Sequence, residues 1–152
     1  MRCASTGRLC SEQYAAARGW EPLAYLTDFE TAAVDFVHGG EGLLMAPAYA
    51  MPRMLDRAGL TLQDFDFYEI HEAFASQVLA TLAAWEKNGL GAIDRAKLNV
   101  NGSSLAAGHP FAATGGRIVA TLGKLLAEKG SGRGLISICA AGGQGVVAIL
   151  ER

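Results

Sequence analysis

Two histidines and one cysteine have side chains that could carry out proton or acyl transfer. His71 follows an apolar segment, His109 lies within Gly108-His109-Pro110, and Cys139 leads into a glycine-rich turn. Histidine can exchange a proton or donate a hydrogen bond to a developing oxyanion. An unperturbed thiol titrates at about 8.5, so a neighbouring cation or dipole can bring it into use at neutral pH.

Each of these residues also has a simpler explanation. Cysteine is among the most buried residue types, so Cys139 could be a small core residue at the end of a strand. His109 could be a loop residue that hydrogen-bonds a nearby carbonyl group, and His71 could bind the backbone at the start of a helix. Residue type alone leaves both explanations open, and the elements that carry these residues must decide.

Hydrophobic periodicity predicts these elements. Strands are expected at 20–29, 65–70, 98–100, 135–139 and 146–150, and helices at 11–18, 46–60, 71–87 and 114–129. Phe74, Val78, Leu82 and Trp85 share one helical face, and Pro52 would be tolerated only in a first helical turn. Strands that alternate with helices, followed by a terminal hairpin, predict an α/β layered domain with a five-stranded mixed sheet covered by helices.

The predicted elements bring the three candidate residues together. In open α/β sheets, ligands bind beyond the carboxyl ends of the strands. His71, His109 and Cys139 each lie at or just after the end of an expected strand, so we expect them to share one rim of the sheet. Glu72 is expected to be an acid in the first turn of the helix 71–87, where it complements the helix dipole.

Composition excludes several classes of protein. The 152 residues, 51% hydrophobic and 18% charged with a net charge of −2, fit one folded domain. The sequence has no basic stripe for nucleic acid, no apolar run that approaches the roughly 20 residues of a bilayer span, and no phosphate-binding glycine motif. Three scattered cysteines, Cys3, Cys10 and Cys139, predict neither a disulfide framework nor a metal site. We therefore expect a reducing, cytoplasmic compartment.

Three motifs, in this order and spacing, resemble the C-terminal half of a thiolase, an acetyl-CoA acyltransferase. They are His71-Glu72-Ala73-Phe74-Ala75, then Asn101-Gly102-Ser103-Ser104 with Gly108-His109-Pro110, and finally Cys139-Ala140-Ala141-Gly142-Gly143-Gln144-Gly145. The first motif begins with histidine where many thiolases have asparagine. In this respect the chain is similar to the branch that includes the β subunits of fatty-acid-oxidation complexes.

The resemblance implies a role for each candidate residue. His109 would activate a nucleophilic cysteine in the N-terminal half and line an oxyanion hole, and Cys139 would be the acid/base cysteine. His71 would hold a water in the first oxyanion hole. The backbone N–H of Ala141, where the family often has glycine, would contribute to the second. The implied reaction is thiolytic cleavage of 3-ketoacyl-CoA to acyl-CoA and acetyl-CoA in fatty-acid β-oxidation, with coenzyme A as a substrate and no other cofactor.

The chain is about one half of a thiolase, so the resemblance also implies a missing part. Residues 20–152 would form the C-terminal domain, while residues 1–19 match the family poorly. Without the nucleophile the chain should be inactive alone, because the covalent step has no acceptor. We expect a thiolase N-terminal half as its partner and possible self-association. The alternatives are a non-catalytic module that binds acyl-CoA or lipid, and a β-ketoacyl synthase relative, which Cys139 argues against.

Overall fold

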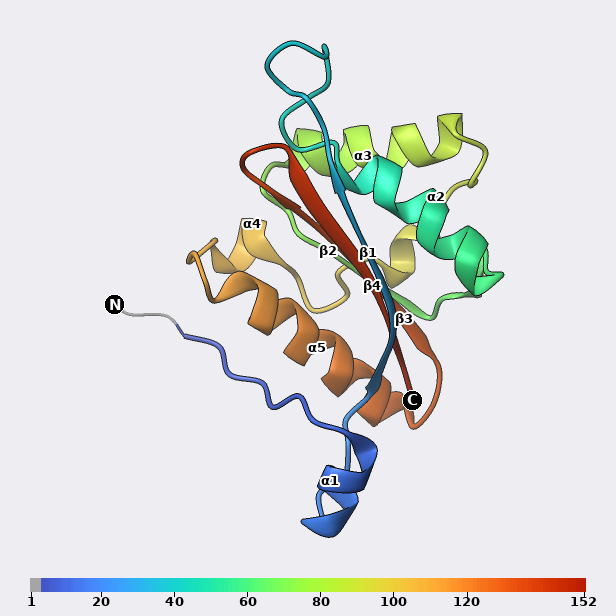
Figure 1. The fold of residues 1–152 in the computed structure, drawn as a ribbon, viewed down its shortest axis with the longest axis vertical. Helices are drawn as coiled ribbons and strands as arrows, with labels where there is room; N and C mark the ends of the chain where they lie inside the picture. The colour runs from blue at the N-terminus through green and yellow to red at the C-terminus, as the bar shows by residue number, and fades with distance from the viewer. Residues whose placement is uncertain (1–3) are drawn as a thin grey trace.

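The computed structural model describes residues 4–152 and consists of a mixed sheet between two layers of helices (Figure 1). The strands are β1 Tyr25–Ala33, β2 Phe67–Ile70, β3 Arg133–Ala140 and β4 Gln144–Glu151. They lie in the order β1-β4-β3-β2. Strand β4 is antiparallel to both of its neighbours, and β2 is parallel to β3. The terminal hairpin of the sequence therefore forms the centre of the sheet.

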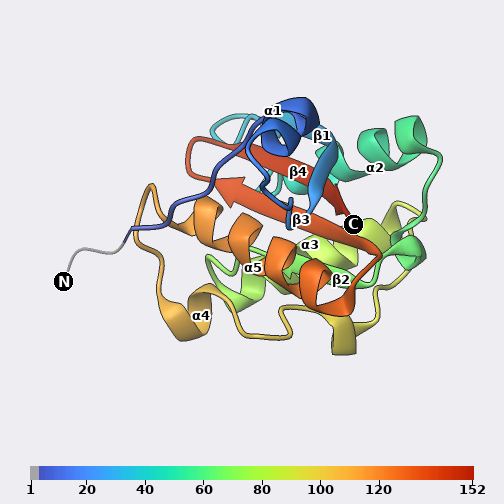
Figure 2. The ribbon, with the colours of Figure 1, turned by 90° about the horizontal axis from the view of Figure 1, so that it is seen from below.

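Helices cover the two faces of this sheet unequally, as a second view shows (Figure 2). Helices α2 (Pro47–Ala58) and α3 (Ala75–Lys87) pack on one face, and α5 (Thr114–Lys129) packs on the other. The shorter elements are α1 (Glu12–Ala17), η1 (Leu62–Asp64), η2 (Arg95–Lys97) and α4 (Ser104–Ala107). The fold is thus the α/β layered arrangement that the sequence predicts.

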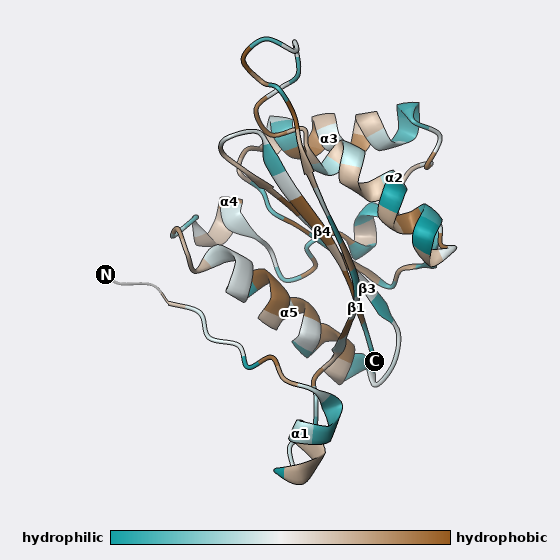
Figure 3. Ribbon diagram, in the orientation of Figure 1, coloured by the Kyte–Doolittle hydropathy of each residue, from teal (hydrophilic) through white to brown (hydrophobic). Residues whose placement is uncertain are grey.

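Alternation along β3 divides the core into two apolar layers, and the hydropathy-coloured ribbon is brown along parts of the central strands and of α5 (Figure 3). Leu135 is fully buried with Met51 of α2 and Trp85 of α3. Its neighbour Ile136 points to the other face and packs with Ile118 of α5. Successive side chains of a strand point to opposite faces, so an unbroken apolar strand requires cover on both sides.

The prediction of five strands is wrong, because residues 98–100 do not form a strand in the described chain. Leu98 makes a single parallel bridge to Tyr68 of β2. The backbone of Asn99 then turns to φ +47°, and its side chain takes the place of the strand. Asn99 Oδ1 accepts from the N–H of Ile70 at 2.9 Å, and Asn99 Nδ2 donates to the Ile70 carbonyl at 3.0 Å.

The predicted helix 71–87 begins four residues later than expected, at Ala75. Phe74 only precedes it, and its side chain is 63% exposed, so Phe74 does not belong to the core. The other members of the predicted face, Val78, Leu82 and Trp85, are buried. Glu72 is not in this helix. Its carboxylate instead accepts from Asn99 Nδ2 at 2.8 Å and from the N–H of Leu105 at 3.0 Å, which caps the first turn of α4.

The strand expected at 20–29 is shifted along the chain to Tyr25–Ala33, while several other boundaries agree closely with the sequence. Helix α5 has the predicted limits, and Ser11 caps α1 by accepting from the N–H of Tyr14. Helix α2 continues through Pro52, which we expected only in a first turn. The fully buried side chains of Met51 and Met54 on either side hold this segment against the core. Packing therefore outweighs the backbone hydrogen bond that proline cannot make.

Candidate active site

His71 and His109 come into direct contact at one end of the sheet. The N–H of His71 donates to the carbonyl of Ser137 on β3 at 2.9 Å, so His71 continues the pairing of β2 with β3. The His71 and His109 ring centroids lie 4.3 Å apart, and the rings are tilted by 49°. The structure thus brings together two residues that are 38 positions apart in the sequence.

His109 reaches this position from a loop between two helices, not from the strand-to-helix loop that the sequence predicts. Gly108 has a φ of +82°, which only glycine adopts readily, and it turns the chain directly before the histidine. His109 Nδ1 lies 2.7 Å from the Thr114 hydroxyl, and that hydroxyl donates to the Pro110 carbonyl at 3.2 Å. Thr114 therefore accepts from His109 Nδ1–H, which leaves His109 Nε2 with a free lone pair that can accept a proton.

His71 is held differently, because its ring is buried rather than exposed. Its side chain is 2% exposed, and its Nδ1 lies 2.8 Å from the Ser104 hydroxyl of α4. Burial is the main cause that lowers the pKa of His71 to about 4; the charges of His109 and Arg117 also lower it, and Glu72 opposes them. His71 is consequently neutral at physiological pH, as a hydrogen-bond donor in an oxyanion hole should be.

Cys139 lies at the same end of the sheet, two residues beyond Ser137 on β3. It is 5% exposed and pairs with Gly145 of β4, where a side chain would collide with Pro47 at the start of α2. Burial raises the pKa of the Cys139 thiol to about 11. The cation or dipole that could lower this pKa is therefore not supplied by the described part of the chain, and Cys139 is a protonated thiol at neutral pH.

Ala141 follows β3 in the tight turn that leads to β4. The turn needs glycine at its next two positions, since Gly142 and Gly143 have φ values of +92° and +73°. Ala141 is exposed, so its backbone borders solvent at the end of the sheet where Cys139 lies. The four predicted site residues thus gather at one end of the sheet, and the two histidines form the contact between them.

Sequence analysis missed four residues that surround the two histidines, namely Glu69, Ser104, Thr114 and Arg117. Arg117 Nη2 donates to the Ser104 hydroxyl at 3.0 Å. Glu69 is completely buried, and burial raises its pKa to about 7. A glutamate inside the otherwise apolar β2 was a signal in the sequence that could have identified this residue. Ser104 and Arg117 act through contacts between separate elements and Thr114 through a local loop contact with His109, none of which periodicity reveals.

Comparison with known proteins identifies the family. Residues 20–152 match the protein family described as "Thiolase, C-terminal domain". This chain belongs to the thiolase family. A 3-ketoacyl-CoA thiolase of Pseudoalteromonas atlantica is 46% identical over 159 aligned positions, and a probable 3-ketoacyl-CoA thiolase of Caenorhabditis elegans is 43% identical. Both alignments cover 97% of this chain, so they reach into residues 1–19.

A solved thiolase-family structure shares the fold. The crystal structure of the Bacillus anthracis acetyl-CoA acetyltransferase superposes with a TM-score of 0.78 at 37% identity, over 93% of this chain. The chain spans only about a third of these proteins: 36% of the Pseudoalteromonas relative and 33% of the Bacillus structure. The α/β thiolase-like fold is therefore established for this portion of a thiolase.

Two further properties concern residues 4–152 only. None of the helices in that part of the chain has both the length and the apolar composition needed to cross a bilayer. Within the same residues, no three His, Cys, Asp or Glu side chains are grouped so that they could hold a metal ion. Cys10 and Cys139 are free thiols, and Cys3 lies outside the described residues.

Proposed function

We propose that this chain is the C-terminal catalytic half of a 3-ketoacyl-CoA thiolase. The observation that carries the proposal is the contact between His71 and His109 at the end of the sheet where Cys139 also lies. A family motif could persist in sequence while its members lay apart in space. Here, residues from two motifs are in contact and Cys139 of the third lies at the same end of the sheet, as a shared reaction centre requires.

The roles follow from the state of each side chain. His109 presents a free Nε2 lone pair and would take the proton of the nucleophilic cysteine. His71, as a neutral donor, would hold a water in the first oxyanion hole, and the exposed backbone N–H of Ala141 would contribute to the second one. Cys139 is protonated and would give its proton to the leaving acetyl carbon, and its thiolate would then take a proton from the incoming CoA thiol that cleaves the acyl-enzyme.

The partner in this proposal is a thiolase N-terminal half, which would supply the nucleophile. Large apolar side chains next to the site support this: Phe74, Leu105 and Phe111 are 63%, 62% and 85% exposed. Each lies on a segment that carries a site residue, and the Phe111 ring centroid is 4.9 Å from that of His109. Such a group of exposed apolar side chains indicates a surface that another domain or a substrate covers. Self-association of the isolated chain would cover the same surface.

The proposal includes finer features that rest on the sequence resemblance. The substrates would be 3-ketoacyl-CoA and coenzyme A, as expected for the fatty-acid-oxidation branch that His71 suggests. Residues 1–19 would remain outside the domain proper. The free thiols of Cys10 and Cys139 fit the reducing, cytoplasmic compartment that we predict.

A thiolysis assay tests this function. The loss of 3-ketoacyl-CoA in the presence of CoA is followed with the purified chain alone, and then with the chain mixed with a thiolase N-terminal half. We expect turnover only in the mixture. Turnover by the chain alone would show that a nucleophile is present, and Cys3 and Cys10 would be the next residues to replace. Binding of acyl-CoA without turnover in either sample would favour the non-catalytic binding module.

A further inference from the structure

A chain of buried hydrogen bonds behind His71 is not explained by the roles assigned above. Arg117 on α5 donates from Nη2 to the Ser104 hydroxyl on α4 at 3.0 Å, and that hydroxyl lies 2.8 Å from His71 Nδ1. Ser104 is 5% exposed and His71 is 2% exposed. Residues from α5, α4 and the end of β2 therefore form one connected polar chain that ends at the His71 ring.

The direction of the hydrogen bonds in this chain follows from donor counting. Arginine is only a donor, so the Ser104 oxygen must accept from Arg117. The Ser104 hydroxyl proton has His71 Nδ1 as its one acceptor among the hydrogen bonds of residues 4–152. A buried hydroxyl proton without a partner is costly. Ser104 therefore donates to Nδ1, and the proton of the neutral His71 ring lies on Nε2.

This tautomer complements that of His109. His109 carries its proton on Nδ1, where it donates to Thr114, and presents Nε2 as an acceptor. His71 has the opposite arrangement, with Nε2–H as the donor. Two histidines whose rings touch are thus assigned different tasks by the hydroxyl group that each one contacts, Thr114 for His109 and Ser104 for His71.

A buried acidic residue, Glu69, interacts electrostatically with Arg117. Glu69 of β2 is completely buried, and neither of its carboxylate oxygens has a hydrogen-bond partner in the described chain. The Arg117 charge stabilises the ionised form of Glu69, although burial still raises the Glu69 pKa to about 7. The two groups therefore compensate each other electrostatically without a direct hydrogen bond, and Glu69 favours a guanidinium group at this position.

We propose that Ser104, oriented by Arg117, is a positioning residue that fixes His71 as the neutral tautomer with its proton on Nε2. The role of His71 as a donor to the water of an oxyanion hole rests on the proposed thiolase function, but the tautomer itself does not. An amide side chain at this position would carry its N–H₂ donor without any such control. A histidine at this position needs a second residue that determines which nitrogen holds the proton.

Ser103 provides a matched control for this proposal. It is also buried, at 1% exposure, and its hydroxyl accepts from the same Arg117 Nη2 at 3.4 Å. Its own proton goes to the Ile70 carbonyl at 3.3 Å and not to a histidine. A change at Ser103 therefore disturbs the same helix turn and the same arginine, but leaves the hydrogen bond to His71 in place.

Nuclear magnetic resonance of ¹⁵N-histidine-labelled chain tests the tautomer without any need for activity. The chain has three histidines, so replacement of His38 and His109 assigns the His71 signals. In the unmodified chain at pH 7, we expect a protonated Nε2 and an unprotonated Nδ1 for His71. Ser104→Ala should give a mixture of tautomers, Ser104→Thr should restore the single form, and Ser103→Ala should leave it unchanged.

Two results would overturn the proposal. One is a protonated Nδ1 of His71 in the unmodified chain, which decides the matter even when a variant fails to fold. The other is a folded Ser104→Ala chain that keeps the Nε2–H tautomer. In the enzyme completed with an N-terminal half, Ser104→Ala should lower kcat by about 10-fold to 100-fold with little change in KM for CoA, a smaller loss than removal of a whole oxyanion donor. If the mixture shows no turnover at all, the proposed function fails while the tautomer result stands.

Discussion

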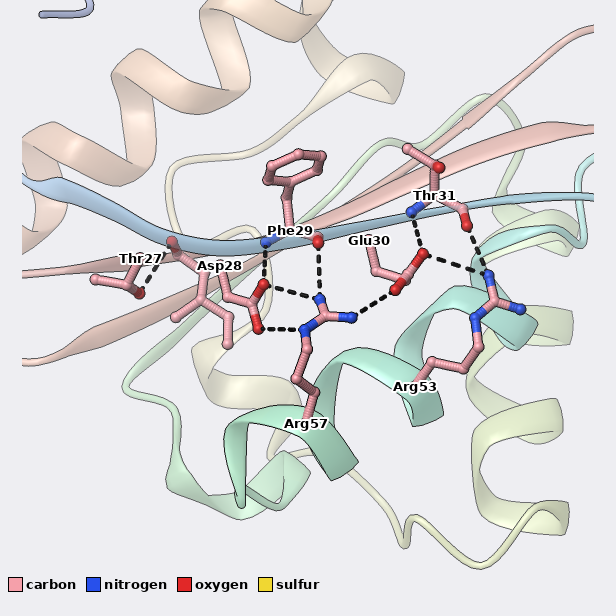
Figure 4. A network of polar contacts seen from close by, with 8 residues as sticks. Thr27, Asp28, Phe29, Glu30, Thr31, Arg53 and Arg57 are labelled. Carbon is pink, nitrogen blue, oxygen red and sulfur yellow. Dashed lines mark hydrogen bonds and ion pairs between the residues drawn. The ribbon is translucent and has the colours of Figure 1, made fainter.

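Two groups of polar residues in this molecule have opposite characters. The surface ion-pair network joins β1 to α2 through Asp28, Glu30, Arg53 and Arg57 (Figure 4). The buried polar cluster consists of Glu69, His71, Asn99 and Ser104 together with the partly buried Arg117, behind the two-histidine contact. In the surface network, every charge faces an opposite charge. In the buried cluster, the Glu69 carboxyl group has no hydrogen-bond partner among residues 4–152, and His71 is kept neutral.

The difference shows that a fully hydrogen-bonded group of charges indicates neither high stability nor a functional site. Arg57 donates to Asp28 at 2.8 Å and to Glu30 at 2.7 Å, and its hydrogen bonds hold the pKa values of both carboxyl groups below their usual range. Water competes for all of these groups, so the network adds little stability and serves mainly to protect the edge strand β1. The strained electrostatics of the buried cluster instead mark a functional site. Four predictions test this comparison.

The largest loss of stability is expected for Asn99→Ala. Its buried amide satisfies both the N–H and the carbonyl of Ile70 and also donates to Glu72. Unpaired buried groups cost about 1–3 kcal/mol each, so we expect a loss of about 3 kcal/mol in the free energy of unfolding, measured by urea denaturation. Asn101→Ala, on the exposed loop that follows, is the control and should change little.

Asn99 has a positive φ, so Asn99→Gly should separate the contribution of the backbone conformation from that of the side-chain amide. Glycine keeps the backbone conformation and loses only the amide. A stability of Asn99→Gly close to that of the unmodified chain would contradict the idea that the amide replaces a fifth strand.

The next effect concerns the pH dependence contributed by Glu69. Its pKa is about 7 in the folded chain and near the ordinary 4.5 when unfolded, so the unfolded state ionises first as the pH rises. Stability should therefore fall between pH 4.5 and pH 7, by about 3 kcal/mol for this group. Glu69→Gln removes that fall, and its advantage over the unmodified chain should grow from pH 4 to pH 8. Arg117 and Glu72 are the charged groups that act on Glu69. A constant difference across this range would mean that Glu69 is already ionised in the fold.

His71 should contribute a pH dependence of opposite sign. Its pKa falls from the ordinary 6.5 to about 4 on folding, so the unfolded state binds a proton first as the pH falls. Stability should be lost between pH 6.5 and pH 4, by about 3 kcal/mol, under the influence of His109, Arg117 and Glu72. His71→Asn should remove this loss, as measured by thermal unfolding at each pH. The two groups nearly cancel between pH 4.5 and pH 6.5, so only the single variants reveal them. Equal pH profiles for His71→Asn and the unmodified chain would contradict a buried, neutral His71.

The smallest effect is expected for Arg57→Met. Arg57 is about half exposed, so its ion pairs gain little over hydration and are screened by salt. We expect a small decrease in Tm at low ionic strength that disappears at about 1 M salt, where the Debye length is short. A large decrease that persists in high salt would mean that the surface network, and not only the buried cluster, has a structural role of its own.

Much of the fold could be predicted from the sequence because strands and helices leave local patterns of apolar residues. The unbroken apolar segments gave β3 and β4, and helical spacing gave the limits of α5. The fifth strand was wrong because the side-chain amide of Asn99 imitates a backbone peptide, a substitution that periodicity cannot detect. Phe74 was placed in the core because an apolar residue beside a helix start has the same spacing as a buried one.

The sequence identified the chemically active residues of the candidate site but not the residues that contact them. His71, His109 and Cys139 were found because their chemistry is rare in this chain, which has only three histidines and three cysteines. The residues proposed to orient His71, Ser104 and Arg117, are ordinary in sequence. They become important only when α4 and α5 fold back onto the end of β2. Long-range packing of this type leaves no periodic pattern.

The most direct test of the central claim is the thiolysis rate of variant chains mixed with a thiolase N-terminal half. His109→Ala and Cys139→Ser should each lower kcat by at least about 100-fold, the usual contribution of a positioned acid or base. Arg57→Met, in the surface network, should retain the rate of the unmodified chain. Unchanged turnover in both His109→Ala and Cys139→Ser would contradict the assignment of this end of the sheet as the reaction centre.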